Sequence, residues 1–197
     1  MEKKGKVIII SGPSGVGKTT LAEKLLKDKK FIKKIVRSIS VTTRPPRRGE
    51  KNGRDYYFIS EKQFLYRRRA GWFLESKKIY QYYYGTPLKK VRCFLKKGVS
   101  VLLCIDVQGA KEVFKKYPDA ISIFVKPPNF EELKRRLCCR QTESKKDIDR
   151  RLSVAREETE NACQYRFVIV NDYLSVAYEQ LVAVVSSQLF SIKGASR

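Results

Sequence analysis

The stretch Gly12-Pro13-Ser14-Gly15-Val16-Gly17-Lys18-Thr19 decides how the rest of this 197-residue chain is organised. It matches the pattern G-x-x-x-x-G-K-[ST], in which a glycine-rich loop wraps around the phosphates of a nucleotide. The apolar, β-branched run Val7-Ile8-Ile9-Ile10 precedes it and predicts a buried strand. Apolar residues at helical spacing follow it from Thr20 to Leu26. This context is the one that the motif requires, so a chance glycine-rich turn is the weaker interpretation.

The residue types of this loop suit a polyphosphate. Glycine lets the backbone approach the ligand closely, so that its N–H groups point into a concave nest at the positive end of the following helix. Lys18 can reach the β- and γ-phosphates, and the Thr19 hydroxyl can bind Mg²⁺. The loop alone therefore predicts a nucleoside triphosphate as ligand and leaves its use open.

The composition of the chain argues against several classes of protein. The length suggests one domain with small inserts, and 42% hydrophobic residues are enough for a core. We find no apolar run long enough for a membrane span and no signal-peptide pattern, so we expect a cytoplasmic protein. Five cysteines without C-x-x-C spacing argue against a disulfide framework or a zinc site. The absence of histidine excludes histidine-based catalysis and leaves positioning and cations, as phosphoryl transfer requires.

The formal net charge of +23 has two explanations. One explanation is that the protein binds nucleic acid. The other is that solvated lysines surround a binding site for anionic nucleotides. The basic residues are spread along the chain and form no separate tail. We therefore favour nucleotide substrates, and nucleic-acid binding stays open as a side activity that is not favoured.

Strand and helix patterns alternate along the chain, which predicts an α/β fold with a mainly parallel sheet. Ser60 and Gln63 form a capping-box pattern, and Pro87 is expected at the first position of a helix. We expect strands at 7–10, 35–41, 55–59, 99–105, 121–125 and 167–170, and the aromatic-rich stretch 72–84 is strand-prone. We expect helices at 60–71, 87–98, 108–116, 129–137, 146–162 and 174–190. Residues 37–86 are expected to form a β-rich insertion, and the polar residues 138–147 suit a mobile lid.

Two groups of residues in the insertion are candidates for substrate binding. Arg44 and Arg47 stand three apart on a proline-rich loop and can clamp a phosphate, whereas the alternative is two solvated arginines. Tyr56 and Tyr84 can donate to phosphate or stack on a base, although most aromatic residues here would fill the core of the insertion. Glu75 can accept two hydrogen bonds from an edge that guanine offers and adenine lacks; otherwise it is a surface charge at a strand end.

Two further groups lie outside the insertion. Asp106 ends the apolar run 101–105, and a carboxylate at the carboxyl end of a parallel strand can lie near Mg²⁺ or a substrate. Arg136, Arg140 and Arg151 flank the expected lid and can close on a transferring phosphate. The alternative for these arginines is a basic helix surface.

As an ordered set, the motifs resemble those of the guanylate kinases. They extend from the P-loop almost to the C-terminus: Gly12–Thr20, Ser40-Val41-Thr42-Thr43-Arg44-Pro45-Pro46-Arg47, Gly49-Glu50, Asn52-Gly53-Arg54-Asp55-Tyr56, Phe73-Leu74-Glu75, Tyr83-Tyr84-Gly85-Thr86, Ile105-Asp106-Val107-Gln108-Gly109 and Ile169-Val170-Asn171-Asp172.

The resemblance implies a P-loop three-layer sandwich with a mainly parallel sheet, a β-rich GMP-binding insert and a helical lid. The core would comprise residues 1–36, 87–136 and 152–197, the insert 37–86 and the lid 137–151. The reaction implied is ATP + GMP giving ADP + GDP, with dGMP as a further acceptor, by direct in-line transfer with Mg²⁺. We expect a monomer or a weak homo-oligomer that does not enter a membrane.

The resemblance also carries roles over to matching positions. Catalytic roles fall to Lys18, Arg44, Arg136, Arg140 and Arg151. ATP would be bound by Gly12, Pro13, Ser14, Gly15, Val16, Gly17, Lys18, Thr19, Thr20 and Asn171, with Thr19 on the metal. GMP would be bound by Ser40, Arg44, Arg47, Tyr56, Glu75, Tyr84, Thr86 and Asp106.

Some positions depart from the pattern of the family. Cys104 stands where an aspartate is usual, Gln141 replaces a lid glycine, and Lys145 and Lys146 replace acidic residues. A thiol is a poorer Mg²⁺ ligand than a hard oxygen, so magnesium would rely on Thr19, phosphates and water.

Three other functions compete with this one. They are a non-catalytic guanylate-kinase-like interaction module, a nucleotide-binding protein whose main partner is RNA, and a P-loop kinase for another monophosphate. The intact Lys18 and the Arg44/Arg47 pair favour catalysis, and Glu75 argues against AMP.

Overall fold

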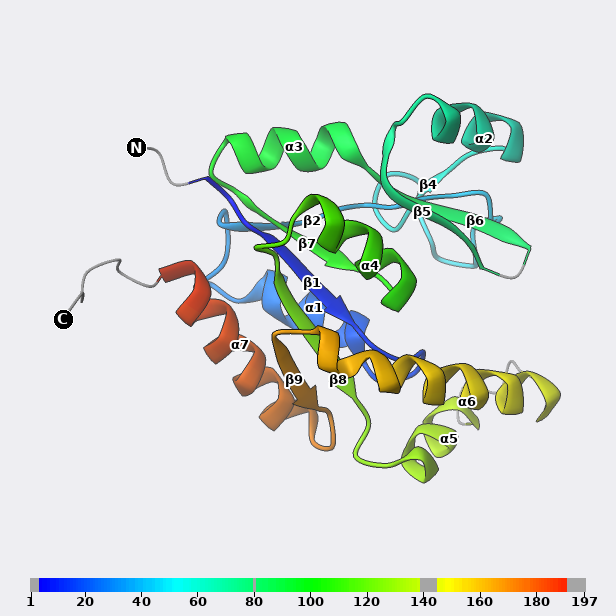
Figure 1. The fold of residues 1–197 in the computed structure, drawn as a ribbon, viewed down its shortest axis with the longest axis vertical. Coiled ribbons are helices and arrows are strands. Elements are labelled where there is room, and N and C mark those ends of the chain that lie inside the picture. The colour runs from blue at the N-terminus through cyan, green and yellow to red at the C-terminus, as the bar shows by residue number, and fades with distance from the viewer. Residues whose placement is uncertain (1–3, 80, 139–144, 191–197) are drawn as a thin grey trace. The chain divides into compact units, whose positions relative to one another are not determined.

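The computed structural model describes residues 4–79, 81–138 and 145–190 (Figure 1). Contacts within the chain divide it into two compact units. The first consists of Met1–Val7, Lys33–Leu103 and Gln108–Ala120, and the second of Ile8–Ile32, Cys104–Val107 and Ile121–Arg197. Among the helices of the described ranges, none has the length and apolar character needed to cross a membrane.

The elements follow one another in an α/β order, as predicted. In chain order they are β1 (Val7–Ser11), α1 (Lys18–Lys27), β2 (Ile35–Arg37), β3 (Val41–Thr42), β4 (Tyr57–Phe58), α2 (Glu61–Arg69), β5 (Phe73–Ile79), β6 (Tyr82–Pro87), α3 (Leu88–Lys96), β7 (Ser100–Cys104), α4 (Val107–Lys116), β8 (Ile121–Lys126), α5 (Phe130–Cys138), α6 (Lys145–Glu160), the 3-10 helix η1 (Asn161–Gln164), β9 (Phe167–Val170) and α7 (Leu174–Phe190).

The strands form two sheets of different character. The larger has the order β2-β7-β1-β8-β9, and the β2–β7, β1–β8 and β8–β9 pairs are parallel. The smaller has the order β4-β3-β6-β5, in which β3–β6 and β5–β6 are antiparallel. The prediction of a mainly parallel sheet is confirmed.

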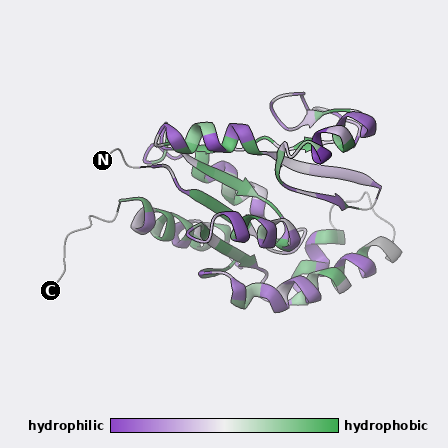
Figure 2. Cartoon of the chain, turned by 45° about the horizontal axis from the view of Figure 1, so that its top comes forward, coloured by the Kyte–Doolittle hydropathy of each residue, from purple (hydrophilic) through white to green (hydrophobic). Residues whose placement is uncertain are grey.

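In the second unit, β1 leads directly into the glycine-rich loop. Ile8, Ile9 and Ile10 are fully buried, as expected of a continuous apolar strand in a parallel sheet. Figure 2 shows hydrophobic residues gathered in the strands of this sheet. Leu21 and Leu25 bury one side of α1, which begins directly after the loop. The loop is therefore held between two elements that are themselves fixed by apolar burial.

In the first unit, α2 packs on the smaller sheet. The Ser60/Gln63 capping box is present as predicted, and it stabilises the start of α2. Phe64 of this helix is fully buried and stacks on Phe73 of β5, with ring centroids 4.6 Å apart. Val41 of β3 completes the same apolar cluster.

Two local predictions were wrong. The expected strand 35–41 is divided, because β2 pairs with β7 in the larger sheet while β3 joins the smaller sheet. Pro87 is not the first residue of a helix: it is extended, with φ −65° and ψ 111°, and pairs with Phe73 at the end of β6. In both cases a distant strand partner decided where the element ends.

Candidate active site

The P-loop has the backbone geometry of a phosphate nest. Gly12, Gly15 and Gly17 have φ values of 135°, 88° and 94°, which residues with side chains rarely adopt. A Cβ at Gly12 would lie 2.0 Å from the carbonyl oxygen of Val125, so the loop packs directly on β8. Within the described residues no side chain caps α1 at Gly17, and the first turn of this helix contains no acidic residue. The amides at its start are therefore available for an anion.

Lys18 folds back over this loop. Its Nζ donates to the carbonyl oxygens of Gly12 at 2.6 Å and Pro13 at 2.7 Å. Thr19 and Thr20 are exposed on the first turn of α1, and Ser14 is exposed on the loop. The predicted ATP-binding residues of 12–20 are thus brought together in one segment.

Asn171 joins the P-loop from the other end of the chain. This residue is buried, and its Nδ2 donates to the carbonyl oxygen of Val16 at 2.8 Å. A Cβ at Gly17 would lie 2.4 Å from the same Nδ2, which explains the third glycine. The Oδ1 of Asn171 is buried and has no hydrogen-bond partner within the described residues. An unused acceptor therefore lies beside the loop.

Arg136 braces the segment that carries Asn171. Its Nη1 donates to the backbone oxygen of Asn171 at 2.9 Å and its Nη2 to that of Asp172 at 3.2 Å. Its Nε donates to Glu132 at 2.7 Å, and Arg135 donates to the same carboxylate. These guanidinium groups lower the pKa of Glu132 to about 2.

Asp106 and Arg151 are the remaining predicted residues of the second unit that the structure describes. Asp106 follows β7 and is half-buried, as is Cys104 at the strand end. Burial raises the pKa of Tyr165 to about 12, and the negative charge of Asp106 adds to this effect. Arg151 is half-buried on α6. Arg140 and Gln141 lie outside the described residues.

In the first unit, Glu75 and Thr86 form a buried polar pair. The Thr86 hydroxyl donates to Oε1 of Glu75 at 2.6 Å, and the two residues are 0% and 5% exposed respectively. The pairing of β5 with β6 is irregular between Phe73 and Ser76. Phe73 pairs with Pro87 and Ser76 pairs with Gly85, so an advance of three residues along β5 corresponds to two residues along β6. Such a bulge turns side chains relative to the regular alternation. Glu75 is therefore buried, and is not the surface charge at a strand end that was the alternative prediction for this residue.

Arg44 is also buried rather than solvated. Its Nη2 donates to both oxygens of Glu50, at 2.8 and 2.9 Å, and its guanidinium lies 5.5 Å from the ring centre of Tyr56. The ring of Tyr84 meets that of Tyr56 edge to face, with ring centroids 6.0 Å apart. Three predicted phosphate-binding residues, Arg44, Tyr56 and Tyr84, thus form one group of neighbouring side chains.

Arg47 and Ser40 border this group. The Arg47 side chain is exposed, and its backbone N–H donates to Glu50 at 2.7 Å. Ser40 is half-buried, and its backbone oxygen accepts from Tyr57 at 2.9 Å.

Sequence reasoning gave no role to Glu50 or Glu132. Both carboxylates hold predicted arginines, and hydrogen bonding from Arg44 lowers the pKa of Glu50. For Glu132 the signal was available, because it stands three and four residues before Arg135 and Arg136 on one helix. Glu50 is six residues from Arg44 in a loop, where spacing predicts no contact.

Comparison with known proteins finds one family throughout. The family model for guanylate kinase matches residues 4–188. The chain is 42% identical to a guanylate kinase of Caldanaerobacter subterraneus subsp. tengcongensis, covering 95% of this chain and 90% of that one. It is 44% identical to a guanylate kinase of Protochlamydia amoebophila, covering 97% and 95%. A crystal structure of guanylate kinase from Anaplasma phagocytophilum matches with a TM-score of 0.78 and 33% identity, covering 97% of this chain and 89% of that one.

Proposed function

The chain belongs to the guanylate kinase family, and from this we infer that it transfers the γ-phosphoryl group of ATP to GMP. We propose further that dGMP is a second acceptor. We also propose that one group of the residues described above binds GMP and that another binds ATP. We propose residues 37–86 as the GMP-binding insert and 137–151 as a lid.

The observation that carries the choice of base is the buried Glu75–Thr86 pair. Glu75 is an acceptor, and the Thr86 hydroxyl holds its carboxylate in place. Guanine presents N1–H and a 2-amino group along one edge, so a fixed carboxylate can accept from both. Adenine presents an acceptor at N1, which would face the negative charge of Glu75. Ser40 and Asp106 are proposed to complete the surroundings of the base.

We assign the phosphate of GMP to Arg44, Arg47, Tyr56 and Tyr84. Glu50 accepts from Nη2 of Arg44 with both carboxylate oxygens, and the backbone oxygen of Pro45 accepts from Nη1, so the direction of the guanidinium is fixed. The Arg47 side chain is exposed and can turn toward the ligand. The two tyrosine hydroxyls add neutral donors.

We assign the phosphates of ATP to the P-loop amides, Lys18, Thr19 and Thr20. Lys18 would exchange its bonds to the Gly12 and Pro13 carbonyls for bonds to phosphate oxygens. The Oδ1 of Asn171, which has no hydrogen-bond partner in the described part of the chain, is an acceptor suited to the 6-amino group of adenine. Arg136 is engaged with Glu132 and two backbone oxygens, so its proposed catalytic role requires that it leave one of them.

The residues of this site suit Mg²⁺ only when the ion is bound together with the phosphates of ATP. Among the described residues, no cluster of three or more His, Cys, Asp or Glu side chains could hold a metal ion. Mg²⁺ is commonly held by one or two protein oxygens together with phosphates and water, and the exposed Thr19 hydroxyl is such an oxygen. Bound in this way, the ion would offset phosphate charge, while the protein positions the reactants.

The chemistry needs no side-chain base. A GMP phosphate oxygen is already an anionic nucleophile, and the main task is to bring two polyanions together in line. Lys18 and the arginines would offset their repulsion and stabilise the transition state. Arg140 and Arg151 are proposed to act when the lid closes and excludes water. ATP and GMP are both available in the cytoplasm, where we expect the enzyme to act, as a monomer or weak homo-oligomer.

A coupled ADP-release assay tests this proposal. With ATP and Mg²⁺ present, GMP, dGMP, AMP, CMP and UMP are offered in turn. We expect turnover on GMP and dGMP, a loss of about 100-fold in kcat/KM for GMP in Glu75→Gln, and no turnover in Lys18→Ala. Equal turnover of AMP and GMP, or full activity of Glu75→Gln, would refute the assignment of Glu75.

A further inference from the structure

A cavity of about 840 Å³ lies within the first unit, beside α3. Trp72, Phe73 and Leu88 provide apolar wall. The lining also contains the basic residues Arg67, Lys89, Lys90, Arg92 and Lys96. None of the residues that line this cavity, all of them in the described part of the chain, is acidic. We call this cavity the α3 groove.

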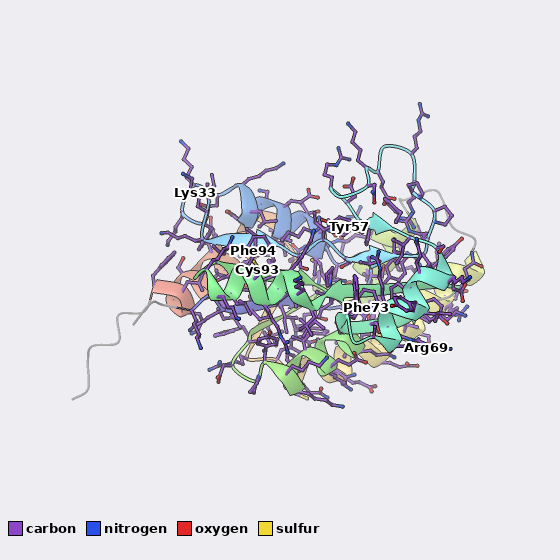
Figure 3. All side chains as sticks on the ribbon, turned by 90° about the horizontal axis from the view of Figure 1, so that it is seen from above. Lys33, Tyr57, Arg69, Phe73, Cys93 and Phe94 are labelled. Carbon is purple, nitrogen blue, oxygen red and sulfur yellow. The ribbon has the colours of Figure 1, made fainter. Side chains whose placement is uncertain are left out.

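One face of α3 forms part of the wall of this groove. Lys89, Arg92, Cys93 and Lys96 stand at i, i+3, i+4 and i+7, so they share one face of the helix. All four are exposed and line the groove, whereas Val91 is fully buried. Figure 3 looks onto α3 and labels Cys93, together with Tyr57 and Phe73 from the groove wall.

Two further cavities of the first unit share lining residues with the α3 groove. A cavity of about 480 Å³ shares Arg92 and Lys96 with it, and another of about 250 Å³ shares Tyr57, Lys90 and Cys93. Lys4 and Lys6 line the first of these and Arg37 the second. Asp119 is the acidic residue among the lining residues. Neighbouring cavities with basic lining residues suit a chain-like anion better than one compact molecule.

The groove also offers an exposed aromatic surface. The side chain of Trp72 is 53% exposed, and the guanidinium of Arg67 lies 5.2 Å from its ring centre. A large aromatic ring beside cations is the combination on which unpaired bases stack while their phosphates bind basic side chains.

This surface differs from the one assigned to GMP. Successive residues of a strand point to opposite faces of the sheet. Pro87 lines the α3 groove, whereas Thr86 before it contacts Glu75. A ligand in the groove would therefore leave the Glu75–Thr86 pair untouched.

We propose that the α3 groove binds single-stranded nucleic acid, with Trp72 stacking on a base and the α3 stripe of Lys89, Arg92 and Lys96 binding phosphates. An acidic peptide would complement the charge but would leave no role for the exposed ring of Trp72. The inference is independent of the catalytic assignment, since none of these residues takes part in it.

The test measures binding of 12-nucleotide rU and dT oligomers to the full chain by fluorescence anisotropy, at several salt concentrations. Trp72 is the single tryptophan of the chain, so its intrinsic fluorescence reports on the groove directly. We expect both oligomers to bind, to quench this fluorescence, and to remain bound when ATP and GMP are saturating. Tighter binding of rU than dT would point to contacts with the 2′-hydroxyl.

Two charge-matched double variants locate the site. Lys89→Glu/Lys96→Glu changes the α3 stripe, and Lys27→Glu/Lys29→Glu makes the same change in charge at exposed positions of the second unit. We expect the first to weaken binding about tenfold or more and to reduce the slope of log K against log salt by about 1.4, because each phosphate neutralised on a single strand contributes roughly 0.7. The second should weaken binding less than about threefold. Trp72→Leu should abolish the quenching and weaken binding about fivefold or more, with kinase turnover unchanged.

Several results would overturn the proposal. Equal weakening by both double variants would show general attraction to a basic protein rather than a groove. Displacement of the oligomer by ATP or GMP would place it in the kinase site. Competition by polyglutamate as effective as that by unlabelled oligomer would favour an acidic protein partner, and unquenched Trp72 would refute base stacking.

Discussion

The side-chain amide of Asn171 donates to the backbone oxygen of Val16 inside the P-loop, at 2.8 Å and across 155 positions of sequence. The other amide atom, Oδ1, is buried without a hydrogen-bond partner among the described residues. One side chain thus supports the phosphate-binding loop and keeps an acceptor beside it.

Replacing Asn171 should affect ATP more than GMP. In Asn171→Ala, the Val16 oxygen loses its donor, and we expect KM for ATP to rise about tenfold while KM for GMP changes little. Steady-state kinetics with each substrate varied in turn will measure this. Asn161→Ala, which removes an amide that bonds Glu157 and Gln164 near η1, serves as control. An unchanged KM for ATP would mean that the loop keeps its shape without this bond.

The Thr86 hydroxyl should matter through the carboxylate that it holds. In Thr86→Val, which keeps the size of the side chain, the buried Glu75 loses the donor at 2.6 Å. We expect KM for GMP to rise about tenfold with KM for ATP unchanged. Thr86→Ser keeps the hydroxyl and should stay close to the wild type. A Thr86→Ser variant as impaired as Thr86→Val would show that keeping the hydroxyl is not enough to hold Glu75, and would contradict this role.

The pairing of Glu132 predicts a pH dependence of stability. Hydrogen bonds from Arg135 and then Arg136 lower the pKa of Glu132 from 4.5 to about 2. A carboxylate with a lowered folded-state pKa stabilises the fold above its unfolded pKa, and this contribution is lost as the pH falls through the folded pKa. Wild type should therefore resist urea better than Glu132→Gln at pH 7, with a difference that declines below pH 4.5 and is gone near pH 2.

Urea midpoints at pH 7, 5, 3 and 2 would measure this difference. Glu131→Gln, which changes the exposed neighbour on the same helix, provides the matched control. A difference that persists unchanged to pH 2 would show that Glu132 contributes through packing rather than through its charge.

Cys104 should be replaceable by the residue that is usual at its position in the family. The thiol is half-buried at the end of β7, two residues before Asp106. Because a carboxylate is a harder ligand than a thiol, we expect Cys104→Asp to keep or raise kcat and to lower the Mg²⁺ concentration needed for half-maximal rate. Titration of Mg²⁺ at saturating substrates will measure both, with Cys104→Ser as control. A collapse of turnover would mean that this site is built differently.

The sequence by itself determined the features that depend on neighbours along the chain. The P-loop was predictable because its glycines, Lys18 and the apolar strand before it act within one continuous segment. The Ser60/Gln63 capping box was predictable for the same reason, since both hydrogen bonds span three residues. The resemblance to the guanylate kinases was also readable, because its motifs are local.

Only the tertiary structure decided which distant segments meet. The division of the expected strand 35–41 depends on two different partner strands, and the position of Glu75 depends on a shift of register against β6. The pairing of Arg44 with Glu50 depends on the path of a loop. Residue type and periodicity describe the preferences of each segment, but a hydrogen bond such as that from Asn171 to Val16 forms only once folding has brought two remote segments together.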